Sequence, residues 1–366
     1  MKKKLAVILS LIMIVSMFLA ACSSQPAAQP QPSQPQSNTE AKDAPAPAES
    51  TKIEHTDVTI AYPNIIELND QVYAARKYKI GYANWSDQNS IAIIVRDSIL
   101  DACKYYGIEC VVFDNDTDPN KAMTNADTAI QMECDYYLNF NNDEAINAAC
   151  AEKLEKAGIP YISIQNAARK GVDPEYHVDN ERAGSICGDL LAAKAKEKWP
   201  DEKPILLIAN QWKAGGTFLL RATSCEDAVK KAIPDVEIFE IETESNPETT
   251  RQATADFLTA HPTGKIMMWC HIDQNTMGML AAVQAAGRQD DVIITSFGAN
   301  PVAFEELKKD DSPLIGTVAQ FSERFGWDLL PIVIKDLNGE EKPPMETMPP
   351  LDIITKDNMT YYYPAA

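Results

Sequence analysis

Short β-rich runs alternate with helical patterns from Tyr78 almost to the C-terminus. Repeated βα units of this length require parallel strands with right-handed helical crossovers, so helices cover both faces of each sheet. The predicted strands are too numerous for one small sheet, which favours two doubly wound α/β domains. These strands span residues 78–84, 110–114, 136–140, 161–164, 205–210, 236–241, 265–271, 292–297 and 314–320.

The helical patterns between these strands carry recognisable start and stop signals. Apolar residues at helical spacing run from Ile91 to Cys103, and Gly107 ends that pattern. Asp118 and Pro119 supply an N-cap and a proline at the first helical position. Pro247 opens another helix in the same way. These signals support the βα assignment independently of the strand pattern.

The N-terminus has the layout of an export signal. Three lysines at positions 2–4 precede an apolar run over residues 5–19, and Ala20-Ala21-Cys22 follows. The apolar run is shorter than the roughly 20 residues that cross a bilayer, so a retained transmembrane helix is not indicated. We expect a lipoprotein signal peptide over residues 1–21 with Cys22 as the lipidated first residue of the mature chain. An ordinary secretory signal with a cysteine at the cleavage point is the alternative.

The next segments connect this anchor to the folded part. Residues 22–52 consist of the lipidated cysteine and a stretch rich in Ala, Gln, Pro and Ser, which predicts a disordered linker. Residues 53–77 form an N-terminal arm in which 55–60 alternate like a strand. The pattern does not place this arm in the fold, although packing on the first domain is one interpretation.

Charge and cysteine content exclude several classes of protein. Removing residues 1–21 takes away three lysines and no acid, so the formal net charge changes from −20 to −23. A chain this acidic is not a nucleic-acid binder by charge, and an anionic membrane surface would repel it. We interpret the acidic composition as a feature that keeps the protein soluble. No CxxC pair or zinc-ligand spacing occurs, so neither a metal site nor a dense disulfide framework is predicted. Seven cysteines besides Cys22 are expected mainly as buried free thiols, although one surface disulfide is possible.

The order and spacing of seven short motifs resemble the ribose-binding-like, sugar-type periplasmic binding proteins of ABC importers. The resemblance covers most of residues 78–355. Its motifs are Asn139-Phe-Asn-Asn-Asp-Glu-Ala145, Ala157-Gly-Ile-Pro160, Val178-Asp-Asn-Glu-Arg-Ala-Gly184, Leu258-Thr-Ala-His-Pro262, Ala286-Gly287, Thr317-Val-Ala-Gln320 and Asn338-Gly-Glu340.

This resemblance implies a type I periplasmic binding protein fold. Two Rossmann-like lobes would be joined by a three-strand hinge, with crossings near residues 178–179, 320–321 and 342–350. Lobe one would contain residues 78–178 and 321–348, and lobe two residues 179–320 and 349–366. The ligand would lie between the lobes.

Ligands of open α/β sheets bind beyond the carboxyl ends of the strands, so candidate site residues follow the predicted strands. They are polar amides, a few charged groups and aromatic rings, which suit a polyhydroxylated solute because amides both donate and accept hydrogen bonds. The candidates are Asn84, Trp85, Asp87, Asn89, Asn139, Asn141, Gln165, Asn166, Trp212, His271, Asp273, Phe297 and Gln320, joined by Arg221 from a helix. Five match ligand-binding positions of ribose-binding relatives: Asn89, Asn139, Arg221, Phe297 and Gln320.

Departures from the relatives' pattern bear on the ligand's identity. An aromatic pair is replaced by Ile91-Ala92, and an Asp-Arg pair by Gln165-Asn166. An acid is replaced by Gly298 and an asparagine by Ile272. These losses argue against a simple pentose or hexose.

Structural roles compete with ligand contact at several candidates. Arg221 could pair with Glu226 or Asp227 on a helix surface, and Asp273 could cap the next helix. Trp85 and Trp212 could pack under loops. His271 is more consistent with a residue at the edge of the core than with a ligand contact. Trp269 lies inside a predicted strand and is more consistent with a core residue.

Enzyme motifs are missing from the sequence. It contains no Gly-x-Ser-x-Gly, GxxxxGK[ST] or HExxH, and no GxGxxG follows the strand over residues 78–84. A secreted hydrolase is the weaker alternative, since a chain with four histidines retains few catalytic options. A transcription regulator of related fold would need an N-terminal DNA-binding helix pair, where this chain has a signal and a linker.

The sequence therefore predicts an extracytoplasmic, lipid-anchored solute-binding protein of an ABC importer that binds a sugar-like or polyol-like ligand. Its expected partners are the permease subunits, with membrane contact through the N-terminal lipid alone. We expect a monomer without cofactor, metal, catalytic residues or nucleic-acid partner. A receptor for a membrane kinase or chemoreceptor, or a binder of a nucleoside, is the alternative.

Overall fold

The computed structural model describes residues 60–365, except for positions 142, 213–215 and 245. The predicted signal peptide, Cys22 and the linker lie outside the described residues. So do residues 55–59 of the strand-like stretch in the arm, and Ile60 is not in a strand.

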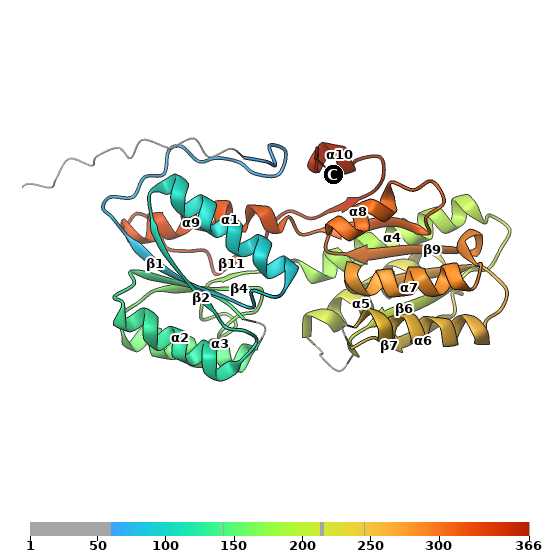
Figure 1. Cartoon of the computed structure of the whole chain (residues 1–366), viewed down its shortest axis with the longest axis horizontal. Coiled ribbons are helices and arrows are strands. Elements are labelled where there is room, and N and C mark those ends of the chain that lie inside the picture. The colour runs from blue at the N-terminus through green and yellow to red at the C-terminus, as the bar shows by residue number, and fades with distance from the viewer. Residues whose placement is uncertain (1–59, 142, 213–215, 245, 366) are drawn as a thin grey trace, which may run out of the picture. The chain divides into compact units, whose positions relative to one another are not determined.

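The first sheet has six parallel strands in the order β11-β5-β4-β3-β1-β2. Figure 1 shows α1 and α9 on one side of this sheet and α2 and α3 on the other. The strands are β1 (Lys79–Asn84), β2 (Glu109–Asp114), β3 (Tyr136–Phe140), β4 (Tyr161–Ile164), β5 (Glu175–Tyr176) and β11 (Glu346–Thr347). The helices are α1 (Ser90–Tyr106), α2 (Pro119–Gln131), α3 (Glu144–Lys156) and α9 (Phe325–Leu337).

The second sheet has the order β12-β10-β9-β8-β6-β7, and β12 is its antiparallel member. Its strands are β6 (Ile205–Asn210), β7 (Ile238–Glu242), β8 (Ile266–Cys270), β9 (Val292–Phe297), β10 (Leu314–Ala319) and β12 (Asp352–Ile354). Its helices are α4 (Asn180–Lys198), α5 (Gly216–Ala232), α6 (Pro247–Ala260), α7 (Asp273–Ala285), α8 (Pro301–Leu307) and α10 (Met359–Tyr362). Two short 3-10 turns are η2 (Gln289–Asp291) and η3 (Ser322–Arg324).

The chain changes sheets three times. It passes to the second sheet between β5 and α4, returns between β10 and α9, and leaves again between β11 and β12. Two doubly wound α/β sheets joined by three segments are the predicted fold class, which is confirmed. The sequence pattern did not predict β5 and β11, because each of these strands has only two residues.

Local chemistry explains where the helices begin. The Asn89 side chain caps α1 by accepting from the backbone N–H groups of Ile91 and Ala92 at 3.0 and 3.1 Å. Asp118 caps α2 with Pro119 at its first position, as predicted. Gly107 ends α1 in the left-handed conformation, with φ 67°.

Two glycines allow α4 and α5 to pack at close range. A Cβ atom at Gly184 would lie 2.0 Å from the backbone oxygen of Arg221, and one at Gly188 would lie 2.4 Å from that of Cys225. Any side chain at either position would therefore push the helices apart. This close approach sets the position of Arg221 relative to the second sheet.

The described part of the arm contacts elements of both sheets. Asn64 donates to the Tyr361 backbone oxygen at 2.6 Å, and Tyr62 packs edge-on against Tyr363. Further along, the Tyr105 hydroxyl of α1 donates to Asp70. The arm therefore joins the C-terminal segment of the chain to the first sheet.

The seven cysteines at positions 103, 110, 134, 150, 187, 225 and 270 are free, and all but Cys110 are buried. This confirms the expectation of buried thiols. Over the described residues, no helix combines the length and the apolar character needed to cross a membrane.

Candidate functional site

A cavity of about 940 Å³ lies at the carboxyl ends of strands from both sheets. Its size is at the upper end of the range of small-molecule sites. Of the fourteen candidates from the sequence, seven lie in its lining: Trp85, Asn89, Gln165, Asn166, Arg221, Phe297 and Gln320. The lining also includes Gln88, Ser90, Ile91, Phe140, Asp143, Glu144, Gly216, Phe218, Ile272 and Gln274.

Arg221 is the buried cation of this lining. Arg221 is 7% exposed, and this burial lowers the pKa of its guanidinium to about 10. Nε and Nη2 donate to the Asn180 side-chain oxygen at 3.0 and 2.7 Å, and Nη1 donates to the His271 backbone oxygen at 3.4 Å. The guanidinium carbon lies 3.7 Å from the centre of the Phe297 ring. Guanidinium carries five N–H groups, so some remain to donate to a ligand while Phe297 fixes its plane.

Aromatic rings and amides complete the lining on the side of the first sheet. Trp85 follows β1 and tilts against Phe140 with ring centres 6.1 Å apart. Asn89 uses its oxygen to cap α1, which leaves its amide N–H groups to donate elsewhere. Gln165 has a positive φ of 75°, an uncommon conformation for a residue other than glycine.

Two hydrogen bonds join the two sides of the cavity. The Gln165 amide donates to the Gln320 side-chain oxygen at 3.1 Å, and Gln320 in turn donates to the Ser322 hydroxyl at 2.9 Å. The Gln274 amide donates to the Ser90 hydroxyl at 2.8 Å. Residues of the two sheets are therefore close enough to contact one small molecule at the same time.

Asp273 lies behind the lining rather than in it. Its carboxylate is fully buried and accepts hydrogen bonds from Ser296, from Thr317 at 2.7 Å and from the backbone of Asn300 at 2.8 Å. Burial raises the pKa of Asp273 to about 6, although these hydrogen bonds oppose the shift. Gly298 lets the chain wrap around the carboxylate, because its φ is 131° and a Cβ there would lie 3.1 Å from Asp273 Oδ2.

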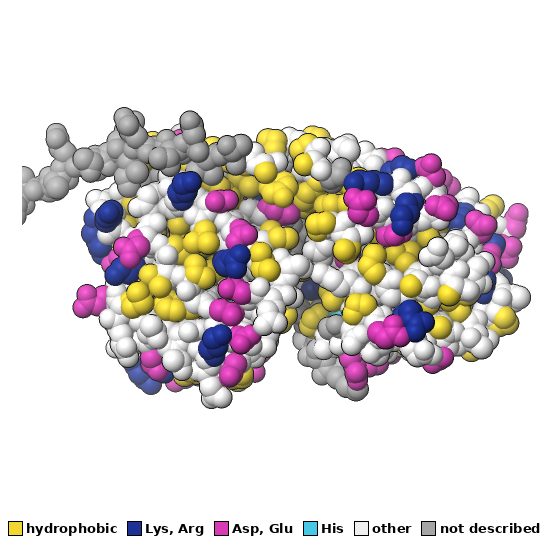
Figure 2. All heavy atoms as spheres, in the orientation of Figure 1, with side chains coloured by type: hydrophobic (Ala, Val, Ile, Leu, Met, Phe, Trp, Pro, Cys, Tyr) yellow, Lys and Arg dark blue, Asp and Glu magenta, His cyan; other side chains and the backbone are white. Residues whose placement is uncertain are grey.

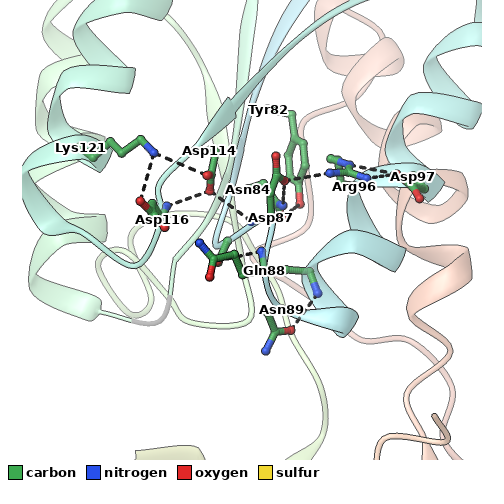
Figure 3. Close-up of polar contacts among 12 residues, drawn as sticks. Tyr82, Asn84, Asp87, Gln88, Asn89, Arg96, Asp97, Asp114, Asp116 and Lys121 are labelled. Atoms are coloured by element: carbon green, nitrogen blue, oxygen red, sulfur yellow. Dashed lines mark hydrogen bonds and ion pairs between the residues drawn. The ribbon is translucent and has the colours of Figure 1, made fainter. Parts of the chain in front are cut away.

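Asn84 and Asp87 belong to a network beside the cavity (Figure 3). The Tyr82 hydroxyl donates to Asn84 at 2.8 Å, and Asn84 donates to Asp87 at 2.7 Å. Arg96 also binds Asp87, at 3.0 Å. These contacts shape the loop between β1 and α1, and neither Asn84 nor Asp87 is in the lining.

Asn139 and Trp212 also lie outside the lining. Asn139 is buried and donates to Asn147 at 2.8 Å, and Asn147 donates to the backbone oxygen of Asn166 at 3.0 Å. Asn139 thus supports the loop that carries Asn166. Trp212 is half-buried and packs against the hydrophobic core cluster that includes Trp269 and Phe297. Trp269 is fully buried, which agrees with its interpretation as core.

Ligands bind beyond the carboxyl ends of parallel strands, and this rule could have identified most of the lining residues that the sequence analysis missed. Gln88 lies in the loop after β1, Ser90 and Ile91 begin α1, and Ile272 and Gln274 follow β8. Phe140 ends β3, and Asp143 and Glu144 begin α3 directly after it. Phe218 is harder to find, because it lies in the first turn of α5 several residues beyond β6.

His271 makes the stability of the fold depend on pH. Burial lowers the pKa of His271 to about 3, and the nearby Arg221 charge adds to the effect. An unfolded chain protonates this histidine below about pH 6.5, whereas the folded chain resists protonation down to about pH 3. The free energy of unfolding should therefore fall by roughly 1.4 kcal/mol per pH unit below pH 6.5 through this residue.

Urea unfolding of wild type and His271→Gln at pH 7, 6 and 5 measures this contribution. The wild-type value should fall relative to the variant as the pH is lowered. Parallel pH profiles of the two proteins would show that His271 does not contribute as described.

Comparison with known proteins gives the family. The model of a family described as periplasmic binding protein domain matches residues 80–341. The chain belongs to this periplasmic binding protein family. Its members are binding proteins that act outside the cytoplasm.

Individual relatives agree with this assignment. The ribose import binding protein of Salmonella typhimurium is 26% identical over 260 residues, which cover 69% of this chain and 82% of that protein. An ABC transporter periplasmic solute binding protein from Actinobacillus succinogenes, solved with bound D-allose, has a TM-score of 0.68 at 20% identity and covers 78% of this chain and 100% of its own. A Caulobacter myo-inositol binding protein, solved with myo-inositol, has a TM-score of 0.66 at 20% identity. The match covers 79% of this chain and 97% of that one.

Proposed function

We propose that this periplasmic binding protein is the lipid-anchored receptor of an ABC importer and takes a sugar-like or polyol-like solute in the cavity. The observation that carries the proposal is the combination of a buried arginine stacked on Phe297 with side-chain amides from both sheets. Hydroxyl groups both donate and accept, so they match amides and a guanidinium better than an apolar solute does.

The charges in the lining favour a neutral ligand. Arg221 is the buried cation, while Asp143 and Glu144 bring two carboxylates at the start of α3. An anionic solute would face these acids, and a cationic solute would meet Arg221. Figure 2 shows acidic and basic side chains interspersed over the visible face, so the acidic composition does not gather there into one patch.

The aromatic residues suit a ring or an extended polyol. Trp85, Phe140 and Phe218 offer apolar faces to the C–H side of such a molecule. D-allose and myo-inositol, the ligands bound in the two solved structures named above, have this character. An unpaired polar group in a closed site costs about 1–3 kcal/mol, which would make the pocket selective for a hydroxyl pattern.

Transport follows from closure around the solute. The ligand stabilises the closed arrangement because only there do both sheets' residues contact it, and the permease recognises that arrangement. The anchor proposed at Cys22 keeps the protein beside the permease. ATP hydrolysis by the importer's cytoplasmic subunits supplies the energy.

A thermal-shift panel of pentoses, hexoses, polyols, oligosaccharides and nucleosides tests the ligand class. We expect at least one sugar or polyol to raise the melting temperature with the logarithm of its concentration. At 100 times the dissociation constant the stabilisation is about 2.7 kcal/mol. A response to nucleosides alone would overturn the sugar assignment.

A further inference from the structure

Three side chains at the edge of the first sheet form a cluster apart from the cavity. Glu175 begins β5, His177 follows that strand, and Glu346 begins β11. One ligand atom from each of the three lies within 4.8 Å of the others. The strands pair in parallel with Glu346 opposite Glu175, and the His177 backbone N–H donates to the Thr347 oxygen at 3.0 Å. The backbone therefore holds the three residues in register.

His177 presents the ring nitrogen that a metal ion needs. Its Nδ1 lies 3.2 Å from the Val178 backbone oxygen. A carbonyl oxygen only accepts, so in the neutral ring Nδ1 carries the hydrogen and Nε2 carries the lone pair. Nε2 is buried and has no hydrogen-bond partner among the described residues. Metal-binding histidines are oriented in this way, with the other nitrogen donating to a carbonyl or carboxylate.

Glu175 is a buried carboxylate directed at that nitrogen. Its side chain is 9% exposed, and its nearest carboxylate oxygen lies 3.9 Å from His177 Nε2, too far for a hydrogen bond. The carboxylate has no hydrogen bond within the described residues. Glu346 brings a second carboxylate oxygen to within 4.8 Å of the ligand atoms of Glu175 and His177. A cation bound among the three would compensate the charge of both carboxylates.

We propose that Glu175, His177 and Glu346 bind a divalent transition-metal ion such as Zn²⁺. Two carboxylates and one neutral imidazole are a ligand set that Zn²⁺ accepts, with water in the fourth position. Ligands about 2.1 Å from a tetrahedral ion lie roughly 3.4 Å apart, so the cluster must contract slightly. Glu346 can make this movement because its side chain is exposed.

The proposed ion would lie beside the segments that connect the two sheets. His177 precedes the segment that leads into α4, and Glu346 precedes the segment that leads into β12. The ion would join two of the three segments that connect the sheets, on the side of the first sheet. The sequence spacing could not predict such a site, because the third ligand comes from a distant part of the chain.

The test is titration of the purified, chelator-treated protein with ZnCl₂, followed by calorimetry and by the melting temperature. We expect one equivalent to bind and to raise the melting temperature. His177→Ala should abolish this binding, and Glu346→Gln, at an exposed position that leaves the fold intact, should weaken it by at least about tenfold. Glu152→Gln, an exposed acid of α3, should bind as wild type.

The free thiols provide an alternative zinc site that must be distinguished. Substitution with Co²⁺ does so, because oxygen and nitrogen ligands give no thiolate-to-cobalt charge-transfer absorption. Absence of zinc binding, unchanged affinity in both His177→Ala and Glu346→Gln, or an intense thiolate absorption would each overturn the site. None of these readouts depends on the sugar ligand, so the proposed function can fail or hold independently.

Discussion

Arg221→Ala is expected to weaken binding of the pocket's solute by at least about tenfold. Arg221 is buried, stacks on Phe297 and retains N–H groups that face the cavity. A hydrogen bond between a neutral group and a charged one contributes about 1.5–3 kcal/mol, which corresponds to roughly 10-fold to 160-fold in affinity. Calorimetric titration with the strongest sugar or polyol of the thermal-shift panel measures the loss.

Two further variants separate binding from folding. Arg221→Met keeps most of the packing against Phe297 and removes the donors, so it should lose affinity as Arg221→Ala does. Arg182→Ala removes an exposed arginine from the first turn of α4 and should bind as wild type. If Arg221→Ala and Arg221→Met both bind within threefold of wild type while folded, Arg221 does not contact the solute.

Gly184→Ala should destabilise the protein by about 3 kcal/mol or more. The new Cβ would lie 2.0 Å from the backbone oxygen of Arg221, and a backbone atom cannot rotate away as a side chain can. Overpacking of this kind costs about 1–3 kcal/mol or more, and the helices α4 and α5 must separate to relieve it. Urea unfolding measures the loss, and the melting temperature should fall by on the order of 10 °C.

A neighbouring substitution serves as the control for this prediction. Ser185→Ala lies on the same helix at a half-buried position and removes a hydroxyl that bonds to the Arg182 backbone oxygen. It should change the free energy of unfolding by less than about 1 kcal/mol. A Gly184→Ala protein as stable as Ser185→Ala would contradict the described packing of α4 against α5.

Sequence patterns predicted the architecture because its elements are long and locally encoded. The strand β1 and the helix α2 each carry their own signal, namely a buried β-rich run and an Asp-Pro start. The order of such units then determines parallel sheets with helices on both faces. The two-residue strands β5 and β11 have no such signal, since pairing alone makes them strands.

The candidate site was predictable in its location but less so in its members. The rule that ligands bind beyond the carboxyl ends of strands places Asn89 and Gln320 near one cavity. The rule does not tell which side chains face the cavity. Asn139 near the end of β3 and Asp273 at the start of α7 satisfy the same rule, yet both are held by the protein's own hydrogen bonds. Only three-dimensional contacts decide between a polar group that supports the cavity wall and one that faces the ligand.

A crystal structure of the protein with the strongest sugar or polyol from the panel tests the central claim most directly. The account predicts the solute inside the cavity, with its hydroxyls on Arg221 and Asn89 and an apolar face on Trp85 or Phe297. A solute bound elsewhere on the protein, with the cavity filled only by water, would contradict it.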